Sequence, residues 1–72
     1  MIQSEVTEHI AVLSETGSGY TKELNMVSWN NAQPKYDIRV WRNTDTGKIM
    51  CKGITMTAEE MAALIEAMKG RI

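Results

Sequence analysis

Lys35, Arg39 and Trp41 are spaced so that all three fall on one face of a single strand. The segment from Lys35 to Arg42 reads KYDIRVWR, in which apolar residues alternate with charged ones and a tryptophan. Successive side chains of a strand point to opposite faces, so the two cations and the indole share a face. Such a surface suits a ligand that is anionic and can stack, and single-stranded nucleic acid is such a ligand.

The candidate nucleic-acid-binding residues are basic and indole side chains from the middle of the chain. They are Lys22, Trp29, Lys35, Arg39, Trp41, Arg42, Lys48 and Lys52. The guanidinium of Arg39 can fork onto a phosphate or stack on a base, whereas lysines act as mobile point charges. Asp37 on the same face either orients Arg39 by an ion pair or repels phosphate. We expect Trp41 to be exposed for stacking, with burial in a dimer core as the alternative. For Trp29, packing and stacking are equally open.

Charge is unevenly distributed along the chain, although its net value is −1. Residues 20–55 contain six Lys or Arg and three Asp or Glu, so they carry +3, and the remaining residues carry −4. A local positive field is what an anion-binding surface needs, whatever the total charge. Basic strand surfaces also occur in proteins without an anionic ligand, so charge alone leaves the function open.

The sequence contains no set of residues typical of a catalytic or metal site. His9 has no serine or cysteine nucleophile near it in the sequence, and Cys51 reads as a small apolar side chain. One cysteine and one histidine are too few for a structural zinc site. We therefore predict no enzyme activity, no metal, no cofactor and no small-molecule substrate.

Four strands followed by one helix would position the candidate residues. The expected strands are Glu5–Glu15, Tyr20–Asn30, Lys35–Arg42 and Lys48–Thr55. In the first strand we expect Val6, Ile10 and Val12 on one face and His9 on the other. Gly53 indicates a bulge or a close approach of backbone in the fourth strand.

The helix carries clear local signals. Thr57 and Glu60 form a capping box, in which a hydroxyl and a carboxylate satisfy N–H groups of the first turn. Apolar residues recur at i, i+3, i+4 and i+7, namely Met61, Leu64, Ile65 and Met68. Gly70 ends the helix. The predicted fold class is α+β, a four-stranded antiparallel sheet followed by one C-terminal helix (β-β-β-β-α) that covers one side of the sheet.

The length of the chain indicates that the fold needs support beyond its own core. Its 72 residues form a single domain, 1–72, and a chain of this size buries only roughly 60% of its unfolded surface. A lone cysteine excludes an internal disulfide, so we expect a homodimer formed through the apolar helix stripe. Ala62, Ala63 and Ala67 lie beside the stripe and could extend this interface. The alternative is that they are ordinary surface residues, because alanine is a good helix former.

The sequence has no apolar run long enough to span a bilayer and no secretory leader pattern. We therefore expect a cytoplasmic protein without a membrane partner, with association with the nucleoid as an option. Its single thiol agrees with a reducing compartment.

The chain resembles a known family over about residues 5–70. YDIRVW, a short polar turn and KGITMTAEEMAALIEAM are similar to the C-terminal domain of the transcriptional coactivator positive cofactor four. The upstream KELNMVSWNNAQPKYDIR is more similar still to the small bacterial, YdbC-type branch of that family. The resemblance implies a homodimer whose curved sheet grooves bind single-stranded DNA with little sequence preference, with RNA as a second candidate.

The same resemblance implies roles for several site residues. Arg39 matches the arginine of the family's DIR element, and Lys52 matches the lysine before the glycine of KGI. Trp41 and Arg42 fall where the coactivator has adjacent aromatics, although one of the two positions is charged here. Trp29 lies near a family aromatic that has a different spacing from the DIR arginine. These 72 residues contain no regulatory serine-rich and acidic tail like that of the eukaryotic protein, so we do not expect coactivation of the eukaryotic type.

The sequence thus predicts a homodimer that binds single-stranded nucleic acid and acts in transcription, replication or repair. The alternative is a dimeric protein-interaction module that uses its sheet surface or edge for a protein partner. The salt dependence of binding separates the two, because only phosphate binding weakens steeply with salt.

Overall fold

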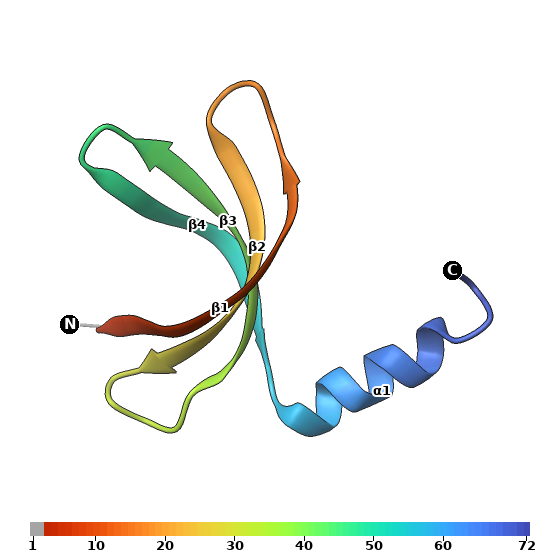
Figure 1. The fold of residues 1–72 in the computed structure, drawn as a ribbon. Coiled ribbons are helices and arrows are strands. Elements are labelled where there is room, and N and C mark those ends of the chain that lie inside the picture. Colours follow the sequence, from red (N-terminus) through yellow and green to blue (C-terminus); the bar gives the residue numbers. More distant parts are fainter. Residues whose placement is uncertain (1–2) are drawn as a thin grey trace.

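The chain folds into one curved sheet with a helix that extends from its last strand. A computed structural model, which describes residues 3–72, contains four antiparallel strands hydrogen-bonded in the order β1-β2-β3-β4 (Figure 1). The elements are β1 (Ser4–Glu15), β2 (Tyr20–Trp29), β3 (Lys35–Thr44), β4 (Gly47–Met56) and α1 (Ala58–Met68). This order confirms the predicted α+β class, and the strand ends lie close to the predicted ones.

The loop between β2 and β3 is shaped by two asparagines in left-handed backbone. Asn30 has φ 51° and Asn31 has φ 63°, a conformation that asparagine tolerates better than most residues. The N–H of Ala32 donates to the carbonyl of Trp29 at 2.9 Å, and the N–H of Asn30 donates to the carbonyl of Gln3 at 2.7 Å. The turn is therefore tied to the end of β2 and to Gln3, just before β1, and it fixes the position of Trp29.

β1 is irregular at three places, which changes the face on which its residues lie. Its pairs with β2 include Val6 with Val27, His9 with Asn25, and Val12 with Glu23. The β2 partners occupy alternate positions of one strand and share a face, so Val6, His9 and Val12 share it too. The predicted separation of His9 from Val6 and Val12 is therefore wrong, because an extra residue at each bulge resets the alternation.

β4 carries a further bulge beside Arg39. Arg39 pairs with Gly53 and Trp41 pairs with Met50, so two residues of β4 stand opposite one residue of β3. A Cβ built on Gly53 would lie 2.2 Å from the Cβ of Arg39, which no real side chain tolerates. The sequence prediction for Gly53 is confirmed on both counts, since a bulge and a close approach of backbone are present.

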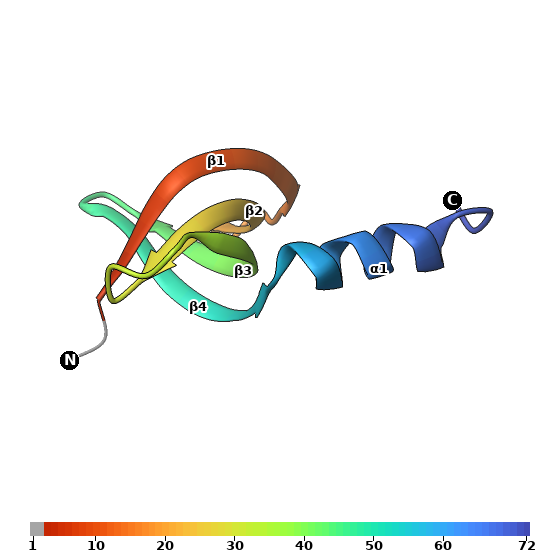
Figure 2. The ribbon, with the colours of Figure 1, turned by 90° about the horizontal axis from the view of Figure 1, so that it is seen from below.

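The buried residues lie on one face of the sheet, and most of them are polar. They are Glu23, Asn25, Val27, Asp37 and Trp41. The pairing of β2 with β3 is regular, and these positions alternate along the two strands, so their side chains face the same side. The sheet curls around this side, and β1 arches across it (Figure 2). We call this side the concave face; its side chains are buried by the curvature of the sheet.

The opposite face, which we call the convex face, carries apolar side chains that are poorly covered. Leu24, Met26, Ile38 and Val40 alternate with the concave residues and are half-buried. Ile54, which pairs with Ile38, is 58% exposed. These apolar side chains are therefore directed away from the concave face.

α1 begins with the predicted capping box and then leaves the sheet. The Oγ1 of Thr57 accepts from the N–H of Glu60 at 3.1 Å, and the Glu60 carboxylate accepts from the N–H of Thr57 at 2.8 Å. The helix points away from the strands (Figures 1 and 2), and within the described chain none of its residues is buried. The expected cover of one sheet face is wrong, because a single residue joins β4 to α1 and leaves no loop to fold the helix back. Within residues 3–72, no helix is long and apolar enough to cross a membrane.

Candidate nucleic-acid interface

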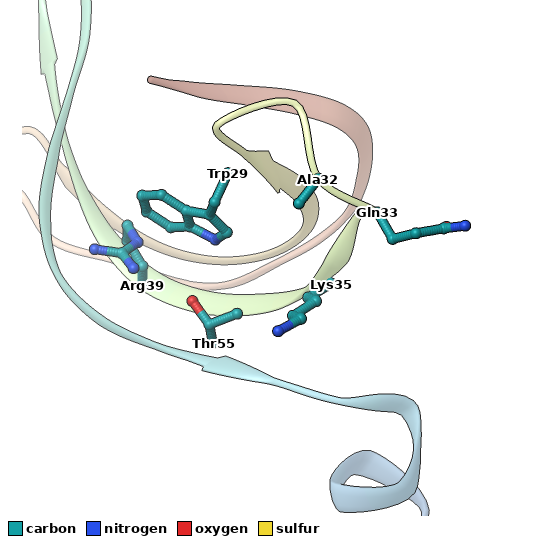
Figure 3. Close-up of a pocket in the computed structure, with 6 residues that line it drawn as sticks. All are labelled: Trp29, Ala32, Gln33, Lys35, Arg39 and Thr55. Atoms are coloured by element: carbon teal, nitrogen blue, oxygen red, sulfur yellow. The ribbon is translucent and has the colours of Figure 1, made fainter. Parts of the chain in front are cut away.

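A pocket of about 350 Å³ opens on the concave face where β2 ends. It is lined by Trp29, Ala32, Gln33, Lys35, Arg39 and Thr55 (Figure 3). β2 supplies the indole, β3 supplies the two cations, β4 supplies the hydroxyl, and the β2–β3 loop supplies the remaining two side chains. We call this the Trp29 pocket. It brings together three predicted site residues, Trp29, Lys35 and Arg39.

Arg39 and Trp29 lie against each other in this pocket. The Cζ atom of Arg39 is 5.2 Å from the centroid of the indole ring, which is within the range of a cation–π contact. The Nε1 atom of Trp29 is buried and has no hydrogen-bond partner among the described residues. The indole is therefore held by packing, and the pair presents two flat groups beside which a planar ligand can stack.

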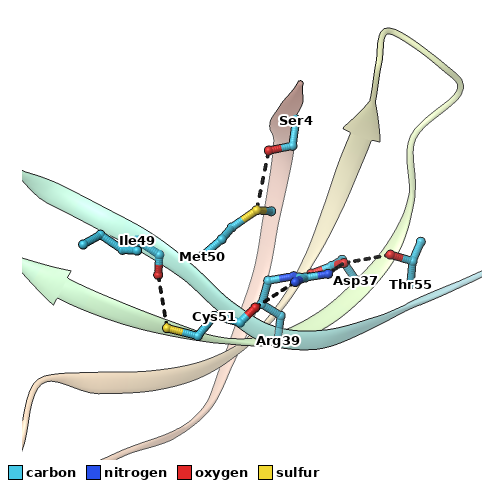
Figure 4. A network of polar contacts seen from close by, with 7 residues as sticks. All are labelled: Ser4, Asp37, Arg39, Ile49, Met50, Cys51 and Thr55. Atoms are coloured by element: carbon cyan, nitrogen blue, oxygen red, sulfur yellow. Dashed lines mark hydrogen bonds and ion pairs between the residues drawn. The ribbon is translucent and has the colours of Figure 1, made fainter. Parts of the chain in front are cut away.

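Asp37 fixes the orientation of Arg39 (Figure 4). The Nε of Arg39 donates to Oδ1 of Asp37 at 2.8 Å, and its Nη2 donates to Oδ2 at 2.9 Å. The Nη1 donates to the backbone carbonyl of Cys51 at 2.9 Å, and the hydroxyl of Thr55 donates to Oδ2 of Asp37 at 3.0 Å. The hydrogen bonds to this buried carboxylate raise the pKa of Arg39 above its ordinary value. Of the two sequence-based options for Asp37, the ion pair is the one present.

A second pocket, of about 270 Å³, lies elsewhere on the concave face. It is lined by Val6, His9, Glu23, Asn25, Trp41 and Lys48, and we call it the Trp41 pocket. Glu23 is 2% exposed, pairs with the ammonium of Lys48, and accepts from the hydroxyl of Thr21 at 2.6 Å. Burial acts to raise the pKa of Glu23, but the hydrogen bonds from Lys48 and Thr21 prevail and lower it below the ordinary value.

His9 closes the polar network of the Trp41 pocket from β1. Its Nδ1 lies 2.7 Å from Oδ1 of Asn25, so the imidazole donates there, and 3.6 Å from Oε1 of Glu23. The carboxylate of Glu23 is thus engaged by Lys48 and Thr21 and lies close to His9. Among residues 3–72, no three His, Cys, Asp or Glu side chains are grouped so as to hold a metal ion.

Trp41 is buried, whereas we expected it to be exposed for stacking. Its side chain lies on the predicted face, but the residue is 7% exposed and its Nε1 has no hydrogen-bond partner among the described residues. The expected exposure is wrong because the curled sheet places residues from β1, β2 and β4 around the ring. Trp29 differs because it stands at the end of its strand, where the sheet opens.

Three of the predicted basic residues line neither the Trp29 pocket nor the Trp41 pocket. Lys22 pairs with Val40 and Arg42 pairs with Tyr20, and these positions belong to the convex face. Lys52 is exposed in the bulge of β4 and lines neither pocket. The predicted set is therefore divided between the two faces and the β4 bulge.

Sequence reasoning missed Thr55 and the loop residues Ala32 and Gln33 as parts of the pocket. Thr55 pairs with Asp37 in the β3–β4 register. Once Gly53 is placed opposite Arg39, counting two residues along each strand finds this pair. The positions of Ala32 and Gln33 depend on the asparagine turn, for which the sequence offers only a general loop signal.

The residues predicted for a dimer interface are accessible in the single chain. Leu64, Ile65 and Met68 line a groove of about 520 Å³ with residues of the C-terminus. Ile65 is 60% exposed, Leu64 is 40% exposed, and Met61 is half-buried. The apolar stripe of α1 is therefore a second uncovered apolar surface, in addition to the convex face.

Comparison with known proteins identifies the family of the chain. Residues 17–67, well over half of the chain, match the family described as Transcriptional Coactivator p15 (PC4). An uncharacterized protein of Treponema pallidum (strain Nichols) is 47% identical over 60 residues, which cover 83% of this chain and 68% of that protein. The matched residues contain the whole Trp29 pocket. The chain therefore belongs to the transcriptional coactivator p15 (PC4) family.

Proposed function

We propose that the protein binds single-stranded nucleic acid, DNA before RNA, with little sequence preference. The observation that carries this proposal is the Trp29 pocket, in which an indole, a guanidinium and an exposed lysine meet on the concave face. An indole and a guanidinium stack on any base, and a lysine attracts any phosphate, so such a site reads no particular sequence. The pocket has the size of an ordinary small-ligand site and is open along the sheet, which suits a base on a continuous strand.

The proposal includes a homodimer, in which a second copy covers the apolar surfaces. The convex face and the stripe of α1 expose Ile54 and Ile65 by 58% and 60%. The buried residues of one chain are mostly polar, so folding of a single copy gains little free energy from the burial of apolar surface. Association with a second copy would bury the exposed apolar surface and supply that free energy. Helix and convex face belong to the same chain, so two copies can cover both surfaces at once.

The family supports the proposed ligand and a role in gene expression. The p15 (PC4) family is generally associated with single-stranded DNA binding and transcription coactivation. We propose transcription as the process, with replication and repair as other processes that expose single strands. The protein would act in the bacterial cytoplasm, at the nucleoid, by binding rather than by catalysis and without a cofactor.

The test compares fluorescence anisotropy of labelled dT20 with that of the matched duplex, at two salt concentrations. We expect tight binding to the single strand, weak binding to the duplex, and quenching of tryptophan emission. The affinity should fall by about 0.7 log units per tenfold rise in salt for each phosphate engaged. The same labelled strand as RNA, run in parallel, measures the preference between the two nucleic acids.

Two outcomes would overturn the proposal. Absence of binding to dT20 at low salt would remove the nucleic-acid function, and the exposed convex face would then favour a protein partner. Light scattering behind size-exclusion chromatography should give twice the mass of the 8.1 kDa chain. A monomer at micromolar concentration would remove the homodimer while leaving strand binding to be judged by anisotropy.

A further inference from the structure

We infer that the guanidinium of Arg39 stacks its plane against a base and does not bind phosphate, because the carboxylate of Asp37 neutralises its charge. We call this guanidinium the stacking plate. Asp37 and Thr55 are then positioning residues that hold this plate, and Lys35 supplies charge for the phosphates. This inference rests on the proposed function, because it states which part of the strand the Trp29 pocket receives.

The Nε–Nη2 edge of the Arg39 guanidinium, which could bind a phosphate in bidentate fashion, already bonds Asp37. A bidentate phosphate contact uses two parallel N–H groups on one edge of a guanidinium. In Arg39 that edge, Nε with Nη2, bonds both carboxylate oxygens of Asp37, and Nη1 bonds the carbonyl of Cys51. The side chain is only 13% exposed. Three of the five N–H donors of this guanidinium are thus engaged, including both donors of the Nε–Nη2 edge.

The buried carboxylate also cancels the charge that a phosphate would sense. The side chain of Asp37 is 0% exposed and lies 2.8 Å from Arg39, so dissolved ions screen this pair far less than a surface pair. Lys35 contrasts with Arg39, because it is exposed and forms no ion pair within residues 3–72. Both residues line the same pocket, yet only Lys35 presents an uncompensated charge.

Thr55 completes the support of the plate from β4. Its hydroxyl donates to Oδ2 of Asp37 at 3.0 Å, and its side chain lines the Trp29 pocket (Figures 3 and 4). Asp37 is bonded by both Arg39 and Thr55, so the carboxylate holds the guanidinium in one plane, and that plane lies beside the ring of Trp29. A base entering the pocket therefore meets a preformed aromatic and guanidinium surface, at little cost in side-chain entropy.

Arg39→Lys tests the inference, because it keeps the charge and removes the plane. Two labelled probes are used, dT20 and a methylphosphonate thymidine 20-mer whose backbone is uncharged. We expect the variant to lose about tenfold in affinity for both probes, the amount typical of stacking on one base. Phosphate binding by Arg39 predicts a different result, with near-normal binding of dT20 and no loss on the neutral probe, and that result would overturn the inference.

Asp37→Asn gives an independent readout that a purely structural role would not change. Loss of the carboxylate releases one net positive charge, so the slope of log affinity against log salt should steepen by about 0.7 for dT20. Lys35→Gln should make the slope shallower by the same amount. If Asp37→Asn retains the wild-type circular dichroism spectrum and the salt slope is unchanged, Asp37 does not neutralise the charge of Arg39, and the inference is overturned.

Thr55→Val keeps both charges and nearly the same side-chain volume, so it remains usable if the other variants fold poorly. We expect a loss of about threefold on both probes without a change in salt slope. Wild-type binding by this variant would remove Thr55 from the positioning set. If the unaltered protein fails to bind dT20, the proposed function and this inference fall together; if it binds, the variants judge the inference alone.

Discussion

In most small proteins the buried face of a sheet is apolar and the exposed face is polar, but here the buried concave face is mostly polar and the exposed convex face carries apolar residues. The concave face buries Glu23, Asn25 and Asp37 at 2%, 1% and 0% exposure, whereas Ile54 on the convex face is 58% exposed. Polar groups are normally buried only when they are hydrogen-bonded, and the three concave side chains meet this condition through ion pairs and hydrogen bonds. The buried polar side chains of the concave face are therefore satisfied within one chain, whereas the convex face leaves apolar side chains exposed.

The two tryptophans show the same contrast on a smaller scale. Both stand on the concave face, and both have a buried Nε1 without a partner in the described chain. Trp41 is enclosed by β1, β2 and β4, whereas Trp29 borders a pocket open to solvent. An indole in the middle of a curled sheet becomes core, and an indole at its open end stays available to a ligand.

Exchange of each tryptophan for alanine should separate these two roles, and Trp41→Ala should have the largest effect. We expect this change to lower the free energy of unfolding by about 3–5 kcal/mol, because a buried ring leaves a cavity. Trp29→Ala should keep most of the stability but lose about tenfold in affinity for dT20. Urea denaturation followed by circular dichroism at one fixed protein concentration, and anisotropy, measure the two effects. Equal stability losses would contradict the contrast.

Ile65→Asp should disrupt the apolar stripe of α1 and weaken the proposed dimer. In the proposed homodimer, a carboxylate on the exposed stripe of α1 has to be desolvated in each copy, so the dimer dissociation constant should rise by about 100-fold or more. Sedimentation over a range of concentrations measures it. Ser18→Asp, in the exposed β1–β2 turn, adds the same charge away from the stripe and should leave the dimer unchanged. Dissociation by both variants would point to general charge repulsion.

Gly53→Ala should disturb the concave side through backbone distance. The new Cβ would meet the Cβ of Arg39 at 2.2 Å, so β3 and β4 have to separate. Overpacking of this kind costs about 1–3 kcal/mol of unfolding free energy. Gly17→Ala is the matched control, because a Cβ there meets nothing within 4 Å and the backbone has no positive φ. The control should stay within about 0.5 kcal/mol of the wild type.

The pH dependence of stability should show the smallest effect, from Glu23 in the Trp41 pocket. Its folded-state pKa is lowered, so between the folded and unfolded pKa values the unfolded chain binds more protons. The stability from Glu23 is therefore present above the unfolded pKa, near 4.5, and is lost as the pH falls through the lower folded value. Glu23→Gln should have a shallower loss of stability in acid, measured by urea midpoints between neutral pH and pH 3. A steeper loss in this variant would contradict the lowered pKa.

Local signals allowed much of the fold to be predicted from the sequence. The alternation of Lys35 to Arg42, the capping box at Thr57 and the bulge signal at Gly53 each act within a few residues, and the structure confirms each. The face of His9 could not be predicted, because a one-residue bulge moves every later side chain to the other side. Bulges in β1 leave little trace in composition.

The candidate site was predictable in its chemistry but not in its arrangement. Lys35 and Arg39 were identified from residue type and spacing, Trp29 was a candidate whose role stayed open, and the three share one pocket. The burial of Trp41 depends on the curvature of the whole sheet, and the pairing of Thr55 with Asp37 depends on the β3–β4 register. Both are tertiary properties that no short stretch of the sequence contains.

The bulges of β1 also bear on how copies of the protein avoid uncontrolled assembly. β1 is an outer strand, and a regular outer strand presents an even row of N–H and C=O groups to which further chains can add in series. Three irregular steps within twelve residues interrupt that row, and β4 at the other margin is bulged as well. We therefore expect the protein to remain dispersed at high concentration rather than to grow into fibrils.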